Sequence, residues 1–163
     1  MGKEIGIKRY SDIDLPEFRY IPGRKLKEGG PARRAQLPDL PPPVPLSAKS
    51  WQDSAHYLYA IDLFNYGYWW EAHEVLEGLW VLARRETPMG IFLQGLIQIS
   101  ASLLKESQSL HKPALSLAAK GIPKIRTKSG IFLGLKIESF LKETEAFLSG
   151  QNPSPPLILL DGV

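Results

Sequence analysis

The chain has 163 residues, a formal net charge of +3 and no cysteine, so it can build one domain with a core but no disulfide, thiolate metal site or cysteine nucleophile. The N-terminal residues lack the apolar segment of a secretion signal. The longest apolar stretch, residues 89–104, is shorter than the roughly 20 residues of a membrane span. We therefore expect a cytoplasmic protein that is not embedded in a membrane.

Residues 1–48 are expected to form an extended, basic, proline-rich arm. They hold eight of the fourteen prolines, and the proline run at residues 38–45 favours polyproline II over a helix or a central strand. Such a run suits either a spacer or a ligand for an aromatic groove. The basic residues at 24–27 and 33–34 could contact phosphate, but no aromatic residues are interleaved with them, so nucleic-acid binding is not expected.

Residues 49–150 are expected to form a bundle of about five helices. Ser47 or Ser50 can cap a first helix that ends near Tyr66, and a second helix covers about residues 68–85. Thr87 followed by Pro88 is a strong start signal for the third helix, because Thr caps well and Pro is favoured at the first helical position. This third helix runs to about Ser107 and is apolar nearly all round, so it should lie centrally.

The fourth helix is expected to begin near residues 112–113, with Gly121 and Pro123 ending or kinking it. The fifth helix should span about residues 131–149. No segment alternates polar and apolar residues with a period of two, so the sequence predicts no sheet.

The apolar tail, residues 151–163, should not remain in water and is expected to dock on the bundle or on another subunit. The arm and the tail are therefore the expected contact surfaces for a second copy of the chain or for a protein partner.

The residues that could carry chemistry gather on the second helix. At about 100° per residue, one face of that helix holds Trp70, His73, Glu74 and Glu77, with Glu71 further round. His73 and Glu77 are four residues apart and can contact each other. Gln94 and Gln98 have the same spacing on the third helix. If the two helices pack antiparallel, a His/Glu/Gln cluster can form between them, with His73 partly buried beside a carboxylate or glutamine.

Three interpretations of this cluster are open. It can be a buried polar network that fixes the helix register. It can also be a small-molecule site in which His73 is an acid or base and Glu77 orients its ring. A metal site would use His73 and Glu77, with His56 or His111 as a third ligand, but Glu is a poor match for the second His of the zinc-protease helix. No metal or other cofactor is therefore predicted. Taken alone, His56 is expected to be partly exposed and His111 to precede a helix.

Two motifs occur in order along these helices. Residues 64–80 contain FNxGxxWEAHEVLExxW, and residues 92–98 are FLQGLIQ. Together they resemble the family catalogued as domain of unknown function 309, over about residues 55–105. The resemblance implies a small all-helical bundle and no established reaction. The residues to which it points are Glu71, His73, Glu74, Glu77 and Gln98, with Asn65 and Gly67 shaping the turn before them.

The sequence thus predicts one all-α domain, a single bundle of about five helices with an extended proline-rich arm. Its function is expected to be that of a scaffold or interaction module with a buried polar network. The alternative is a small-molecule binding protein or hydrolase-like enzyme, with or without a metal ion. The catalytic candidates are His73, Glu74 and Glu77, and the ligand-binding candidates are Glu71, Gln94, Gln98, Trp70 and Asn65.

Overall fold

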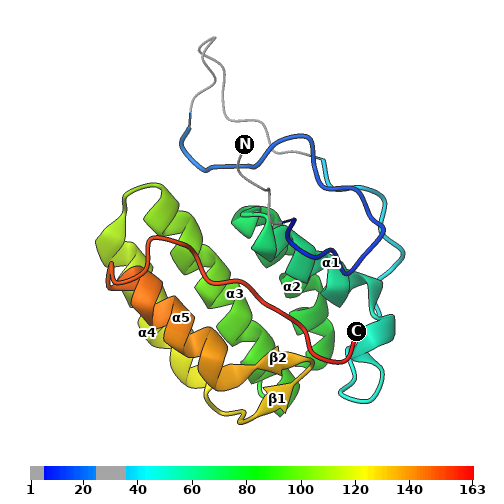
Figure 1. The fold of residues 1–163 in the computed structure, drawn as a ribbon. Helices are drawn as coiled ribbons and strands as arrows, with labels where there is room; N and C mark the ends of the chain where they lie inside the picture. The colour runs from blue at the N-terminus through cyan, green and yellow to red at the C-terminus, as the bar shows by residue number, and fades with distance from the viewer. Residues whose placement is uncertain (1–5, 25–35) are drawn as a thin grey trace.

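A computed structural model describes residues 6–24 and 36–163. Within these residues five α-helices pack as a bundle beside one short hairpin (Figure 1), which confirms the predicted fold class. The elements in chain order are η1 (Trp51–Asp53), α1 (Ala55–Asn65), α2 (Trp69–Ala83), α3 (Pro88–Ser107), α4 (His111–Ile125), β1 (Ile131–Phe132), β2 (Leu135–Lys136) and α5 (Ile137–Leu148). The basic residues at 25–27 and 33–34 lie outside the described residues. The division of the chain at residues 48 and 150 stays a prediction.

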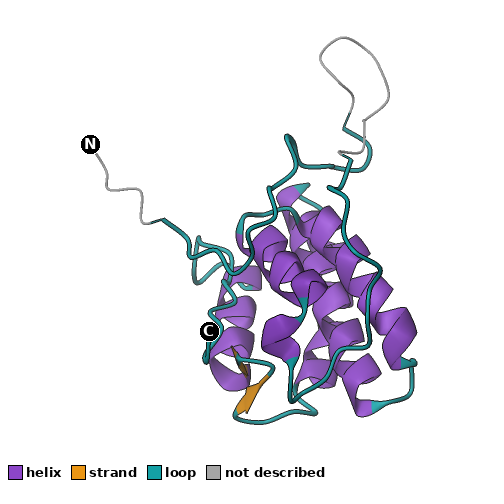
Figure 2. Cartoon of the chain, turned by 90° about the vertical axis from the view of Figure 1, so that its right-hand side faces the viewer, coloured by secondary structure: helices purple, strands orange, loops and turns teal. Residues whose placement is uncertain are grey.

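The core lies between helices that follow one another in the chain, because α1 packs on α2, α2 on α3 and α3 on α4. The third helix is central, as predicted, and its side chains at Phe92, Leu96 and Leu103 are at most 1% exposed. Figure 2 shows the helices lying side by side, with loop segments along their outer surface. The chain's non-helical ends therefore lie against the surface of the helices (Figure 2).

Capping side chains set where two of the helices begin. Thr87 Oγ1 accepts a hydrogen bond from the Gly90 backbone N–H at 3.0 Å, so the predicted start of α3 is correct. The predicted cap of the first helix at Ser47 or Ser50 is wrong. Ser54 holds the extended backbone of a cap and accepts from the Tyr57 N–H at 3.2 Å, so α1 starts at Ala55 after the turn of η1.

The fourth helix starts at His111 and continues through Gly121 and Pro123 to Ile125, so the expectation that these residues end it is wrong, while the alternative that they kink it stays a prediction. Gly121 lies where α4 crosses α3. A Cβ added to Gly121 would lie 3.0 Å from the carbonyl oxygen of Gly95, closer than ordinary van der Waals contact. The glycine marks a close helix contact and not a helix end.

A hairpin replaces the first part of the expected fifth helix, and the prediction of no sheet is wrong at this place. Leu133 and Gly134 both have positive φ, of 48° and 75°, which is typical of a tight two-residue hairpin turn. Phe132 pairs with Leu135 across it. Each strand has only two residues, which is too short to produce an alternating pattern.

The C-terminal tail docks on the bundle of its own chain. Ile158 and Leu160 are 1% and 7% exposed. The Asp161 N–H donates to the Gly134 carbonyl at 2.8 Å, and Leu160 forms an antiparallel bridge with Leu135. In Figure 1 this tail, drawn in red, runs over the helices toward the hairpin.

Candidate functional site

His73 lies in the middle of the predicted site on α2. Its Nε2 is 3.2 Å from Glu77 Oε1, and the two side chains are 21% and 47% exposed. The expected partial burial of His73 beside a carboxylate is therefore confirmed. The pair is at the edge of the bundle and not in its core.

A small pocket of about 80 Å³ adjoins His73. The residues that line it are Pro22, Trp69, Trp70, His73, Ala101, Leu104 and Lys105. The Trp70 ring lies 5.2 Å from the His73 ring, and Tyr20 packs edge-on against Trp70 at 5.0 Å. Pro22 of the N-terminal segment thus lines the pocket, and Tyr20 packs against one of its lining residues, Trp70.

The two glutamines of α3 do not join His73 in the way that the sequence suggested. Gln98 Oε1 accepts a hydrogen bond from Lys124 of α4 at 3.0 Å, and Gln94 is half-buried earlier on α3. Because α2 and α3 are joined by a short turn, residues early in α2 meet residues late in α3. His73 therefore faces Ala101 and Lys105, beyond both glutamines.

Glu71 is 1% exposed and holds the N-terminal segment. Its Oε1 accepts from the Tyr20 backbone N–H at 2.7 Å, while Oε2 is buried without a partner among the described residues. Burial raises the pKa of the Glu71 carboxyl, and the charge of half-buried Glu74 acts in the same direction. The Tyr20 N–H and the charge of Arg19 oppose the shift. Glu71 thus faces its own chain and is closed to solvent.

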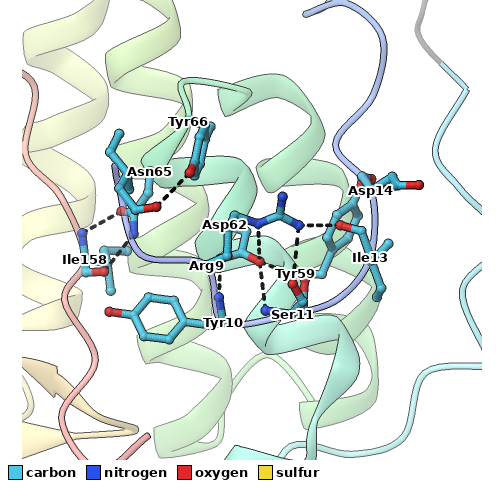
Figure 3. Close-up of polar contacts among 11 residues, drawn as sticks. Arg9, Tyr10, Ser11, Ile13, Asp14, Tyr59, Asp62, Asn65, Tyr66 and Ile158 are labelled. Atoms are coloured by element: carbon cyan, nitrogen blue, oxygen red, sulfur yellow. Dashed lines mark hydrogen bonds and ion pairs between the residues drawn. The ribbon is translucent and has the colours of Figure 1, made fainter. Parts of the chain in front are cut away.

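Asp62 of α1 was not among the predicted site residues, although it is fully buried. Its Oδ2 accepts from Arg9 Nε at 2.9 Å, and from the N–H and hydroxyl of Ser11 at 2.9 and 2.7 Å. Oδ1 accepts from the Tyr10 N–H at 2.8 Å (Figure 3). A lone acid inside the apolar stretch 60–64 is the signal that could have identified it, since a buried carboxylate needs partners.

Asn65 ends α1 and pairs with the backbone of the tail. Its Nδ2 donates to the Ile158 carbonyl at 2.8 Å, and its Oδ1 accepts from the Ile158 N–H at 2.7 Å (Figure 3). The side-chain amide of Asn65 therefore pairs with both backbone polar groups of Ile158, as the backbone of a neighbouring β-strand would. Asn65 also borders a groove of about 390 Å³, which Arg19, Gly67 and Trp69 help to line.

Three tyrosine hydroxyls near the α1–α2 turn hold the N-terminal segment by its carbonyl groups. Tyr59 donates to Asp14, Tyr66 to Ile7 and Tyr68 to Pro16, at 2.9, 2.7 and 2.9 Å. Burial raises the pKa of the Tyr59 phenol to about 12, which keeps this hydroxyl a neutral donor. These three hydroxyls thus bind the backbone of the N-terminal segment.

The other two histidines lie away from His73 in the sequence and have separate environments. His56 is only 8% exposed, so the expectation that it is partly exposed is wrong, and burial lowers its pKa. His111 Nδ1 lies 2.9 Å from Glu106 Oε2 at the start of α4. Across residues 6–24 and 36–163, no three His, Cys, Asp or Glu residues form a group that could hold a metal ion.

Part of the chain matches a known protein family. Residues 57–117 match the family described as Domain of unknown function (DUF309). The DUF309 match runs from α1 into α4, so the resemblance indicated by the two motifs is confirmed over these residues. A comparison with curated proteins finds no match. In the described part of the chain, no helix has the length and apolar character needed to cross a membrane.

Proposed function

We propose that this chain is a helical interaction module that offers its proline run to a protein partner. Residues 41–45, Pro-Pro-Pro-Val-Pro, are all exposed, and Val44 is 63% exposed. Leu40 packs against the core before them, and Leu46 is buried after them. A proline segment held at both ends has little conformational entropy left to lose on binding, which favours recognition by an aromatic groove.

The polar contacts of α1 and α2 support this proposal. Asp62, Asn65 and Glu71 each bind backbone groups of the terminal segments, at 2.7 to 2.9 Å. A scaffold needs its extended segments to be held in fixed positions, and these side chains hold the terminal segments of the chain. These contacts support a role of the motif in the fold, as the first of the sequence interpretations suggests.

A hydrolase-like role for His73 and Glu77 has less support. Ligand pockets commonly have volumes of roughly 300–1,000 Å³, whereas the pocket at His73 has about 80 Å³. We therefore assign no reaction to this pair.

The test is a binding titration of the full chain with purified domains of the classes that bind proline-rich peptides in aromatic grooves. Saturable chemical-shift changes should appear with at least one domain. The double variant Pro42→Ala/Pro45→Ala should lose them, because these grooves read prolines three positions apart. Pro153→Ala, at an exposed proline of the tail, is the matched control and should bind like the wild type.

Binding that survives the double variant would reject the proposal and leave the run as a spacer. Sedimentation of the wild type and the double variant adds a second readout. Self-association that the double variant abolishes would identify the partner as a second copy of this chain.

A further inference from the structure

A groove with aromatic walls lies beside the α1–α2 turn, between the N-terminal segment and the C-terminal tail. Its volume is about 390 Å³, which lies within the range of roughly 300–1,000 Å³ for ligand-binding pockets. Its walls carry three aromatic side chains and two prolines, Phe64, Tyr66, Trp69, Pro155 and Pro156. No residue in 36–46 lines it, so the proline run of the same chain leaves it unfilled. Aromatic lining of this kind is what polyproline II segments dock on.

Arg19 brings a positive charge to this groove. Its exposed guanidinium lies 5.2 Å from the centre of the Tyr68 ring. A Cβ added to Gly67, which also lines the groove, would lie 3.3 Å from Arg19 Cζ, and the φ of 78° at Gly67 favours glycine. Arg19 acts electrostatically on the buried carboxyl of Glu71, but it forms no ion pair with any residue in 6–24 or 36–163. The groove thus offers an accessible cation to an acidic ligand.

The proline run presents an acid on the same edge as two of its prolines. Polyproline II has three residues per turn. Leu40 and Leu46 are two turns apart, so they share one edge of the run, and both pack in the core. Asp39, Pro42 and Pro45 share another edge, and all three are exposed. Asp39 forms no ion pair within the described ranges, so its charge is available to a partner.

We infer that the groove receives residues 39–45 of a second copy of the chain, an inference that rests on the function proposed above. The charges complement each other, because the exposed edge of the run carries Asp39 and the groove carries Arg19. The prolines of that edge then meet the aromatic walls. Since each copy has one run and one groove, reciprocal exchange about a two-fold axis closes a dimer.

The experiment is sedimentation of the full chain over a range of concentrations, in which the wild type should form a dimer. Arg19→Glu should weaken dimerisation about tenfold or more, because it places two acids opposite each other. Adding Asp39→Arg to that variant should restore most of the lost affinity, since the two charges are then exchanged. Arg24→Glu, at an exposed arginine of the same segment that does not line the groove, should dimerise like the wild type.

Ser154→Trp tests the groove without changing its charge. Ser154 lines the groove and is exposed, and the hydrogen bond it makes to Asn152 uses its backbone N–H. An indole at this position should fill the groove and weaken dimerisation. Ser116→Trp, at an exposed serine of α4, is the matched control. Circular dichroism shows whether each variant is folded.

The outcomes separate this inference from the proposed function. A wild type that stays monomeric overturns the inference, while the proposed function then depends on the titration with separate domains. Dimerisation that Pro42→Ala/Pro45→Ala abolishes but Arg19→Glu and Ser154→Trp leave unchanged also overturns it, because the run then binds another surface. A loss in Arg19→Glu that Asp39→Arg does not repair would overturn the pairing of the two residues. Loss followed by repair supports the inference and the proposed function together.

Discussion

Two buried carboxylates near the α1–α2 turn differ in how fully they are satisfied. Both oxygens of Asp62 accept hydrogen bonds, whereas Glu71 uses only Oε1 and leaves Oε2 without a partner among the described residues. Desolvation of a carboxylate favours its neutral form unless donors compensate. Glu71 is therefore a residue at which the stability of the fold should depend on pH, beside His56, whose pKa is lowered by burial.

The stability of the fold should depend on the protonation of Glu71. Burial raises its pKa above the ordinary value of 4.5, so the folded state binds this proton more tightly than the unfolded state does. The free energy of unfolding is then larger below pH 4.5 and falls as the pH rises through the raised pKa. Urea unfolding from about pH 4 to pH 8 should show that the free energy of unfolding of the wild type falls relative to that of Glu71→Gln over this range. The opposite contribution of His56, whose pKa burial lowers, is common to both proteins.

Glu86→Gln is the matched control for this measurement, because Glu86 is exposed in the α2–α3 turn. Its stability curve should run parallel to that of the wild type. A Glu71→Gln curve that is also parallel would show that the protonation of Glu71 is not linked to folding.

The backbones of α3 and α4 come close together where the two helices cross. Cβ atoms added at Gly95 and Gly121 would lie 2.7 Å from the Ile125 side chain and 3.0 Å from the Gly95 carbonyl oxygen, respectively. The two backbones can approach this closely only because neither position has a side chain. The glycines are thus set by packing, although Gly weakens an isolated helix.

Gly121→Ala should lower the free energy of unfolding by about 1–3 kcal/mol, because a methyl group overpacks the crossing. Gly78→Ala in α2 is the control, since nothing lies within 4 Å of its added Cβ. That change should stabilise the protein by up to about 1 kcal/mol through helix propensity. Chemical denaturation measures both effects. Stabilisation by both substitutions would contradict the close contact.

In the molecule as a whole, α1 and α2 hold both ends of the described chain. Asp62 and the tyrosines bind residues 7–16, Glu71 binds Tyr20, and Asn65 binds the tail at Ile158. Tyr10 joins the two ends directly, because its hydroxyl accepts from the Leu160 N–H at 2.9 Å. Folding of the ends is therefore coupled through these two helices.

Asp62→Asn should release the N-terminal segment and lower the free energy of unfolding by about 2–4 kcal/mol, since the amide cannot accept at both atoms from the buried donors. Hydrogen exchange should become faster at Tyr10 and Ser11, whose N–H groups bond to Asp62. Asp12→Asn, at an exposed acid of the same segment, should change neither quantity. Unchanged exchange in Asp62→Asn would mean that other contacts hold the segment.

Features that depend on neighbours in the chain could be predicted from the sequence. Thr87 and Pro88 mark the start of α3 because a cap bonds to an N–H three residues on. The spacing of His73 and Glu77 predicts their contact because both lie on one helix. The hairpin at residues 131–136 could not be predicted from the sequence. Its strands are too short to show an alternation of polar and apolar residues, and its turn contains a leucine in the left-handed backbone conformation, which the sequence does not signal.

The long-range partners of the polar side chains were decided by the tertiary structure alone. Gln98 meets Lys124, Asp62 meets residues 9–11 and Asn65 meets Ile158, across separations of 26 to 93 residues. Such pairs depend on how helices and segments are placed in space, which no local pattern encodes. The sequence by itself therefore determined the helical class and the residues of the motif, since these follow from periodicity and capping. The tertiary structure decided that Asn65 and Glu71 bind the chain's own ends, and that His73 faces a small pocket.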